Sequence, residues 1–407
     1  MTATDRGPSS WSDPPADPAS RPEADPASRP GADPAATAGA LSDPERTRGL
    51  RAAARRAWLG RSRRGRWLIA VAAGLVALLA GTGAAWWRLT YLPPVEAVPS
   101  TLPAPHTWAS GVWTGGDWSP ARVAAFGTWR GSPVSTVTAY PAYQTWAELA
   151  GSDWNVGVFD GFPGRLAYGL PLLPKTPGTG TLADVAAGAH DDAFTAVAQT
   201  LVKHQRGDAF VRIGLEANGD WFPWGASADG NDPAAFKAAY RHVAGVLRAV
   251  APKLTLVFDI GCGHPLRDQA TRLDSLTALY PGDDVVDVVG CDHYDAHSTI
   301  SRTAAQFATS LTPGDAAGLQ DVVDFARAHH KKFAIPEWGL TQLSAKGGGD
   351  NPYYIYAMYR FFQANAKDLA FENYFNEPAA YIANSIWDVV QQPNAAAEYR
   401  TLWSADR

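Results

Sequence analysis

The chain has 407 residues, of which 46% are hydrophobic, and a formal net charge of −5. This length and hydrophobic fraction allow a large buried core. The charge becomes more negative once an arginine-rich segment near the N-terminus is set aside, which argues against nucleic acid and strongly anionic glycans as partners.

The first 66 residues do not have the composition of a folded domain. Most of them are Pro, Ala, Asp or Ser, and the sequence ADPASRP begins at Ala16 and again at Ala24. Such a segment has few apolar side chains to bury, so ordering it would cost backbone entropy without compensation. Nine arginines follow between Arg46 and Arg66. We therefore predict a disordered segment over residues 1–66 with an arginine-rich end.

An uncharged run over residues 67–87 predicts a transmembrane helix. Roughly 20 apolar residues cross the hydrocarbon layer of a bilayer, and Trp67, Trp86 and Trp87 stand at the two ends of the run, where indole rings favour the interface. The run is too long, and begins too far from the N-terminus, for a cleaved signal peptide. The arginines precede it and only Arg88 directly follows it. The positive-inside rule therefore places the N-terminus in the cytoplasm and the rest of the chain outside.

A proline-rich stretch over residues 88–107 predicts an extended linker. Over residues 108–407, strand-like and helix-like runs alternate, which is typical of a parallel sheet with crossover helices. Eight strand candidates in about 300 residues predict a (β/α)8 TIM barrel. A doubly wound open sheet is the alternative, but no glycine-rich phosphate loop follows the first strand.

Seven strand candidates and four helix candidates have clear positions, whereas the third strand is ambiguous between residues 155–161 and 165–173. The other strands are predicted over 110–116, 133–140, 210–216, 253–261, 285–292, 332–339 and 371–375, and the helices over 191–204, 233–250, 315–330 and 353–364.

The strand candidate that begins at Phe210 ends in a carboxylate and continues into an aromatic loop. The sequence reads FVRIGLEANGDWFPWG, with Glu216 at the predicted strand end. Asn218, Trp221 and Trp224 follow this acid. An amide donor and large rings are the residue types that hydrogen bond to a sugar and stack on it, although the two rings could equally pack in the core.

This segment resembles the acid/base motif of the glycoside hydrolase family 26 mannanases, in which an Asn-Gly pair and Trp-Phe-Pro-Trp follow the glutamate. Residues 280–295, YPGDDVVDVVGCDHYD, resemble the sixth strand of that family, and residues 332–339, KFAIPEWG, resemble the strand that carries its nucleophile, here Glu337. One position departs from the family: Leu215 stands where a histidine usually precedes the acid/base residue.

The resemblance implies a retaining, endo-acting hydrolase of a β-linked polysaccharide such as mannan, xylan or glucan, with no cofactor and no metal. It assigns Glu216 as the acid/base and Glu337 as the nucleophile, with carboxyl groups about 5 to 5.5 Å apart. In a TIM barrel both acids would lie at the C-terminal ends of strands, where they can converge. Asn218 would bind a hydroxyl, and Trp221 and Trp224 would stack on the sugar.

Three further residues are expected to support this site. The resemblance implies that Tyr294 donates a hydrogen bond to Glu337. Asp292 lies on the same strand face as Tyr294 and is expected either to line the cleft or to accept a structural hydrogen bond. Arg212 points into the barrel below the acid/base residue and could pair with Glu337 or with Asp259 on the neighbouring strand.

The two cysteines, Cys262 and Cys291, follow strands that a barrel makes neighbours. They could be buried free thiols, they could form a disulfide, or with His264 and His293 they could bind zinc, although no CxxC spacing supports a zinc site.

Three functions are therefore open. The first is a membrane-anchored glycoside hydrolase that acts outside the cytoplasm. The second is a barrel that binds glycan without cleaving it, in polysaccharide export or wall assembly, which Leu215 favours. The third is transglycosylation by the same residues, with a sugar in place of water as the attacking group. We expect a monomer whose partners are a polysaccharide or oligosaccharide and, through one helix, the membrane.

Overall fold

The computed structural model describes residues 92–116, 119–268 and 272–405. The segments predicted to be disordered (1–66) and membrane-spanning (67–87) lie outside these residues. Within the described part of the chain, no helix combines the length and the apolar character that crossing a bilayer requires.

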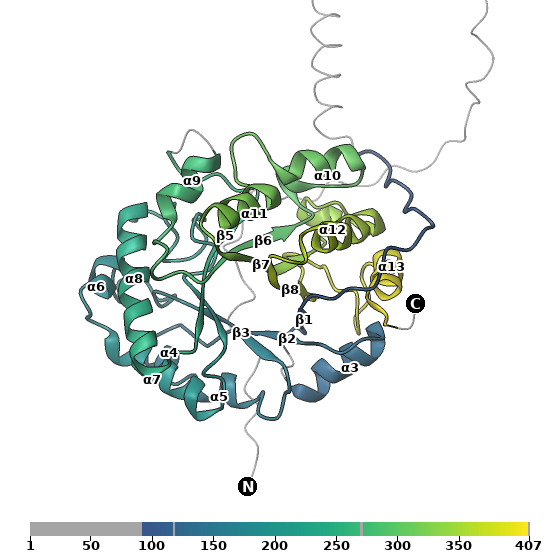
Figure 1. Ribbon diagram of the computed structural model, residues 1–407. Helices are drawn as coiled ribbons and strands as arrows, with labels where there is room; N and C mark the ends of the chain where they lie inside the picture. Colours follow the sequence, from purple (N-terminus) through teal and green to yellow (C-terminus); the bar gives the residue numbers. More distant parts are fainter. Residues whose placement is uncertain (1–91, 117–118, 269–271, 406–407) are drawn as a thin grey trace, which may run out of the picture. The chain divides into compact units, whose positions relative to one another are not determined.

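The described residues form a closed barrel of eight parallel strands in chain order, with helices around it (Figure 1). Each strand pairs with the next along the chain, and the eighth pairs with the first. The predicted (β/α)8 barrel is confirmed, and the third strand comes from the second of its two candidates. The strands are β1 (Ser110–Trp113), β2 (Thr136–Ala139), β3 (Arg165–Leu170), β4 (Phe210–Ile213), β5 (Thr255–Gly261), β6 (Val288–Tyr294), β7 (Lys332–Gly339) and β8 (Leu369–Phe375).

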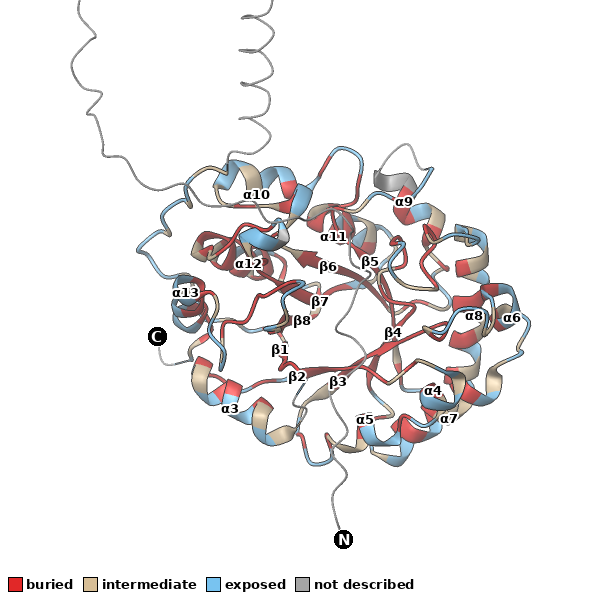
Figure 2. Cartoon of the chain, turned by 180° about the vertical axis from the view of Figure 1, so that it is seen from behind, coloured by how far each residue is buried: buried red, intermediate tan, exposed pale blue. Residues whose placement is uncertain are grey.

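The helices cover the outside of the barrel, with buried residues toward the strands and exposed residues toward solvent (Figure 2). They are α3 (Pro120–Arg130), α4 (Trp146–Ala150), α5 (Asp153–Gly157), α6 (Leu182–Ala186), α7 (Asp191–Lys203), α8 (Pro233–Val250), α9 (Arg272–Leu279), α10 (Ala304–Leu311), α11 (Leu319–Ala328), α12 (Pro352–Asn365) and α13 (Pro393–Trp403), with short 3-10 turns at His297–Thr299 and Leu343–Ala345.

Two helix starts show how local sequence sets the boundaries. Asp232 caps α8 by accepting a hydrogen bond from the Ala235 backbone N–H at 2.7 Å, and the next residue is a proline, so the helix has its predicted bounds. Helix α11 begins later than the predicted residue 315. Its first turn is closed by Asp321, which accepts from the Gly318 backbone N–H at 3.1 Å, and a Cβ on Gly318 would lie 2.4 Å from the Ser310 carbonyl oxygen.

Strand β4 ends at Ile213, three residues before the predicted end. Gly214 has φ +58°, and a Cβ there would lie 2.7 Å from Leu172 and 2.9 Å from Phe236, so a glycine is required on both counts. Glu216 also has positive φ, +52°. Non-glycine residues held in this region are strained and cluster at functional sites. The chain therefore brings the Glu216 carboxyl to the barrel mouth by a turn and not by strand alternation.

The barrel interior has an apolar lower layer and a polar upper layer. Two glycines make room for the polar layer: a Cβ on Gly169 would lie 2.6 Å from the Tyr140 ring, and one on Gly111 would lie 2.0 Å from Asn373 Oδ1. Asn373 in turn donates to Thr138 Oγ1 at 2.8 Å. The lower layer consists of Ala167, Phe210, Val257, Val288, Ala334 and Phe371.

The described part of the predicted linker, from residue 92 to 107, packs on the barrel. The Ala104 carbonyl accepts a hydrogen bond from Tyr359 Oη of α12 at 2.7 Å. Glu96 Oε2 accepts from the Ala304 backbone N–H at 2.7 Å and so satisfies a donor at the start of α10. These residues are held against two helices, and the packed domain extends to the N-terminal side of residue 108.

Candidate active site

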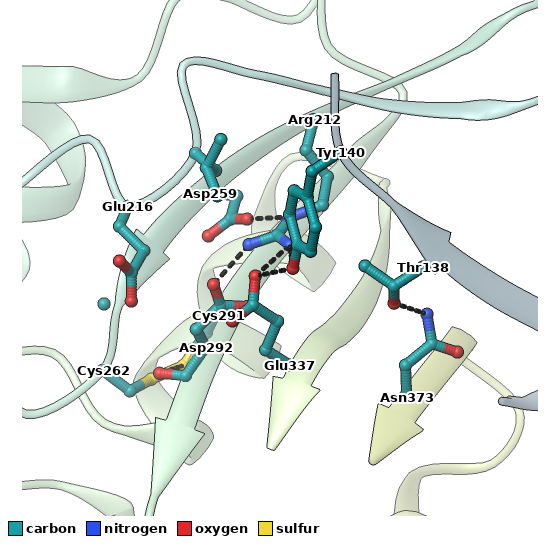
Figure 3. A network of polar contacts seen from close by, with 12 residues as sticks. Thr138, Tyr140, Arg212, Glu216, Asp259, Cys262, Cys291, Asp292, Glu337 and Asn373 are labelled. Atoms are coloured by element: carbon teal, nitrogen blue, oxygen red, sulfur yellow. Dashed lines mark hydrogen bonds and ion pairs between the residues drawn. A yellow bond between two sulfur atoms is a disulfide. The ribbon is translucent and has the colours of Figure 1, made fainter. Parts of the chain in front are cut away.

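Arg212 lies inside the barrel with no exposed side-chain surface. Its Nε donates to Asp259 Oδ2 at 2.5 Å, its Nη1 donates to Glu337 Oε1 at 2.6 Å, and its Nη2 donates to Asp292 Oδ2 (Figure 3). The fixed fork of the guanidinium makes such simultaneous pairing possible. The sequence left open whether Arg212 pairs with Glu337 or with Asp259, and the structure contains both pairs.

Three carboxyl groups around one guanidinium would leave an excess of negative charge if all were ionised. Burial raises the pKa of Asp259 to about 6, with the Arg212 charge opposing the shift. Burial also raises the pKa of Asp292 well above its ordinary value, and the Arg212 charge again opposes the shift. Asp292 is 2% exposed, so it acts as the buried acceptor of the two roles expected for it and does not line the cleft.

Glu337 accepts hydrogen bonds from three side chains. Tyr294 Oη donates to Oε2 at 2.7 Å, and Arg212 and Tyr140 Oη both donate to Oε1. The Tyr294 contact is the one that the resemblance implied. Tyr140 was not among the predicted site residues. It follows β2 and has the same strand parity as Thr138, which faces the barrel interior. All three partners donate, so the arrangement suits a negatively charged carboxylate and fixes its orientation.

Glu216 lies across from this cluster in Figure 3, in a different environment. Trp221 Nε1 donates to Glu216 Oε2 at 2.5 Å. Burial, and then the negative charge of Glu337, raise the pKa of Glu216 to about 8. One carboxyl group therefore keeps its proton near neutral pH, while the other is surrounded by donors. Such a pair can donate a proton on one side of a bond and stabilise positive charge on the other.

Of the two tryptophans predicted to stack on a sugar, the structure leaves one at the surface. Trp221 is 38% exposed and its ring meets that of His264 edge-on at 4.8 Å. Trp224 is fully buried, stacks on Phe222 at 4.6 Å and donates to the Leu215 carbonyl at 2.8 Å. The prediction that Trp224 forms a sugar-binding wall is therefore wrong, because its ring packs in the core.

The side chain of Asn218 is also occupied. Its Nδ2 donates to the carbonyl oxygens of Gly261 and His264, both at 2.8 Å, and its Oδ1 accepts from the Gly261 backbone N–H at 2.7 Å. The residue is 1% exposed. We correct its predicted role: Asn218 ties the Glu216 loop to the end of β5, and its amide is not free to bind a sugar hydroxyl.

Cys262 and Cys291 form a disulfide with a Cα to Cα distance of 5.5 Å. It links the residue that directly follows β5 to the middle of β6, and these two strands carry Asp259 and Asp292. Free thiols and a zinc site with these cysteines are thereby excluded, and His293 is buried against Tyr354, whose Oη lies 2.9 Å from His293 Nδ1. Within the described ranges, no group of three or more His, Cys, Asp or Glu side chains could hold a metal ion.

Aromatic side chains from other strand ends pack against the two tyrosines that donate to Glu337. Trp113, which ends β1, lies edge-on to Tyr140 with ring centroids 5.1 Å apart and stacks on Phe375 of β8 at 5.8 Å. Phe375 in turn meets Tyr294 edge-on at 6.0 Å. Trp113 and Phe375 were not among the predicted site residues, although each is the last residue of a strand that points to the barrel mouth.

Residues 191–338 match the family model described as "Glycosyl hydrolase family 26", and both glutamates lie within this match. Endoglucanase H of Acetivibrio thermocellus is 25% identical over 303 residues, which are 71% of this chain and 30% of that protein. A mannan endo-1,4-beta-mannosidase of Bifidobacterium adolescentis is 28% identical over 225 residues, 53% of this chain and 20% of that protein. The chain thus spans less than a third of either relative.

Solved structures share the fold. The catalytic domain of a GH26 endo-beta-1,4-mannanase from Bacillus sp. JAMB-750 superposes with a TM-score of 0.54 at 16% identity, covering 74% of this chain and 86% of that one. At this identity the likeness shows the barrel fold, and the family 26 match itself covers residues 191–338.

Replacing Arg212 tests the buried cluster. Arg212→Leu leaves three buried carboxyl groups without a cation and should lower the free energy of unfolding by about 3–5 kcal/mol at pH 7. The deficit should grow as pH rises from 5 to 8. Burial raises the pKa values of Asp259 and Asp292 and the Arg212 charge opposes that shift, so without the cation the folded variant keeps these two acids protonated while the unfolded chain ionises them freely. Urea unfolding followed by tryptophan fluorescence measures both effects.

The control is Arg241→Leu, since Arg241 pairs with Asp284 at the surface and should contribute about 1 kcal/mol or less. Equal losses in the two variants, or a deficit at Arg212 that does not change with pH, would contradict the role of Arg212 as the counter-ion of the cluster.

Proposed function

We propose that this chain is a retaining glycoside hydrolase that cleaves a β-linked polysaccharide at internal bonds. The observation that carries the proposal is the contrast between the two glutamates at the barrel mouth. Glu337 accepts from a cation and two phenols, whereas Glu216 accepts from the Trp221 indole and has a pKa raised to about 8 by burial and by the Glu337 charge. The family 26 match over both residues supports the same assignment.

In the proposed reaction, Glu337 attacks the anomeric carbon while Glu216 gives its proton to the leaving glycosidic oxygen. The bond between the sugar and the leaving group breaks as a covalent glycosyl ester with Glu337 forms. Glu216, now ionised, takes a proton from water, and the resulting hydroxide equivalent displaces Glu337. Two inversions at one carbon retain its configuration. Tyr294, Tyr140 and Arg212 orient Glu337 for both steps.

The substrate proposed is a β-linked mannan or glucan, with xylan as a further candidate from the resemblance. The two curated relatives are named as an endoglucanase and as a mannan endo-1,4-beta-mannosidase. The exposed ring of Trp221, beside the proposed acid, is the candidate platform on which a sugar ring of such a polymer would stack.

A barrel that binds glycan without cleaving it is the second candidate, and Leu215 in place of the usual histidine favours it. The raised pKa of Glu216 favours the hydrolase, because a binder needs no group that is a proton donor at neutral pH. Transglycosylation would proceed through the same glycosyl ester on Glu337, with a sugar hydroxyl as the second attacking group.

We further propose that residues 67–87 anchor the chain in a membrane, with the N-terminus in the cytoplasm and the barrel outside. The arginines that precede the run support this orientation. The Cys262–Cys291 disulfide supports it independently, because disulfides persist in oxidising compartments.

Protease added to intact spheroplasts should therefore digest the barrel and spare a tag at the N-terminus, because only the barrel would be accessible from outside. Immunoblots against the two ends give the readout, and lysed spheroplasts, in which both ends are accessible, serve as the control. Protection of the barrel with loss of the N-terminal tag would show the opposite orientation.

The two glutamates should differ in how azide rescues their alanine variants. On a β-glycoside with a dinitrophenyl leaving group, Glu216→Ala should still form the glycosyl ester and then stall, because departure needs no proton but hydrolysis needs a base. Azide should restore turnover by about 10²-fold or more and give a product of retained configuration. Glu337→Ala cannot form the ester, so azide should attack the opposite face and give inversion. NMR of the azide products shows the configuration.

An exchange of these two stereochemical outcomes would mean that the roles of the glutamates are exchanged. If the wild type binds oligosaccharides but forms no glycosyl ester on any activated glycoside, detected by mass spectrometry of the intact chain, the protein is a binder and the hydrolase proposal fails.

The pH profile reports on the proposed acid. Because protonated Glu216 is the active form, kcat/KM should fall as pH rises through about 8. The Trp221 hydrogen bond favours the ionised form and lowers this pKa, so Trp221→Phe should move the alkaline limb to higher pH. Trp146→Phe is the control, because its indole donates to the Thr179 carbonyl away from the site. A limb that stays in place, or moves to lower pH, would contradict the assignment.

A further inference from the structure

The loop after β8, residues 376–384, lies at the barrel mouth between the ends of β7 and β1. A Cβ on Gly339, the last residue of β7, would lie 2.8 Å from Asn384 Nδ2. A Cβ on Gly115, just after β1, would lie 3.5 Å from the Asn376 carbonyl oxygen. The loop therefore contacts the end of the strand that carries the proposed nucleophile.

The base of this loop is closed by reciprocal hydrogen bonds. The Glu377 backbone N–H donates to Asn384 Oδ1 at 2.8 Å, and the Asn384 backbone N–H donates to the Glu377 carbonyl at 3.0 Å. Tyr374 Oη of β8 donates to the Asn384 carbonyl at 2.7 Å. Below the tip, Ile382 is 9% exposed, whereas Tyr381 is 37% exposed. The loop thus holds the Tyr381 ring partly exposed on a fixed base.

Glu377 stands at the start of the loop, close to the aromatic side chains around Glu337. Its Oε2 accepts from Trp113 Nε1 at 3.2 Å, and its Oε1 accepts from the Ala379 backbone N–H at 3.0 Å. Trp113 lies edge-on to Tyr140, which donates to Glu337. An ionised carboxyl group has about four acceptor positions, so Glu377 keeps capacity for the hydroxyls of a ligand.

Tyr381 is suited to donate a hydrogen bond at this place. Burial, and then the charges of Glu377, Glu337 and Glu216, raise the pKa of its phenol above the ordinary value, so the O–H is retained throughout the physiological range. The place of Tyr381 follows from the loop itself, which carries Glu377 and contacts the end of β7 through Asn384.

We propose that Glu377 and Tyr381 form a sugar subsite beside the catalytic glutamates that selects uncharged glycans over uronic acids. Tyr381 donates to one sugar hydroxyl and Glu377 accepts from another. The inference rests on the proposed hydrolase function and names the substrate class of that site.

The selection follows from charge. A uronate bound at this subsite would bring another carboxylate beside Glu377 and Glu337, and like charges in contact disfavour binding strongly. Arg212 cannot offset them, because its guanidinium already serves three carboxyl groups inside the barrel. A neutral sugar meets no such repulsion and gains the two hydrogen bonds.

The test uses the full chain and two β-1,4-linked oligosaccharides of equal length, one neutral and one oxidised at C6 to carry a uronic acid. The wild type should prefer the neutral compound by about tenfold or more in kcat/KM. Glu377→Gln keeps the shape but removes the charge, so the ratio of uronate to neutral cleavage should rise about tenfold. Tyr381→Phe removes one hydrogen bond and should lower kcat/KM on the neutral compound by about threefold to tenfold.

Two matched controls lie on outer helices: Asp324→Asn on α11, whose side chain is 64% exposed, and Tyr356→Phe on α12. Neither control should change the ratio of uronate to neutral cleavage or the kcat/KM on the neutral compound. Calorimetric titration of each variant with both oligosaccharides measures selectivity in binding, which remains readable without cleavage. Selectivity that Glu377→Gln leaves unchanged, or a Tyr381→Phe variant that matches Tyr356→Phe, would overturn the subsite. A wild type that binds but cleaves neither compound would overturn the hydrolase instead.

Discussion

A guanidinium buried among three carboxyl groups is the constraint on which the rest of this barrel depends. Arg212 has no contact with water, and a buried charge is tolerated only with close partners. Asp259, Asp292 and Glu337 come from three successive strands, so this one cation fixes the relative positions of β4, β5, β6 and β7. The disulfide from Cys262, just after β5, to Cys291 in β6 is a second, covalent link between two of these strands.

The same cluster makes the two glutamates different although their side chains are identical. Glu337 belongs to the cluster and receives its donors, whereas Glu216 lies outside it and meets an indole N–H. The negative charge that Arg212 helps to hold at Glu337 is also one of the causes that raise the pKa of Glu216. Removing Arg212 would therefore disturb Glu337 directly, because the two side chains are in contact. It would disturb Glu216 indirectly, through the charge of Glu337.

The order of strands and helices could be predicted from the sequence because alternating apolar runs report burial directly. The end of β4 could not be predicted, because the residue types at Gly214 and Glu216 do not show that both adopt a positive φ. Trp221 and Trp224 are the same residue type three positions apart, and only their packing shows that one is at the surface. Tyr140 could not be predicted, because a tyrosine next to a strand end is common and its role depends on Glu337 across the barrel.

The segment before β1 reaches the barrel at α10, where Glu96 bonds the first residue of that helix. Helix α10 belongs to the connection that follows β6, so this anchor point stands on the same end of the barrel as the two glutamates. A chain cut at residue 108 would therefore leave the Ala304 backbone N–H and the Tyr359 hydroxyl without these partners, so residues 92–107 belong to the folded unit.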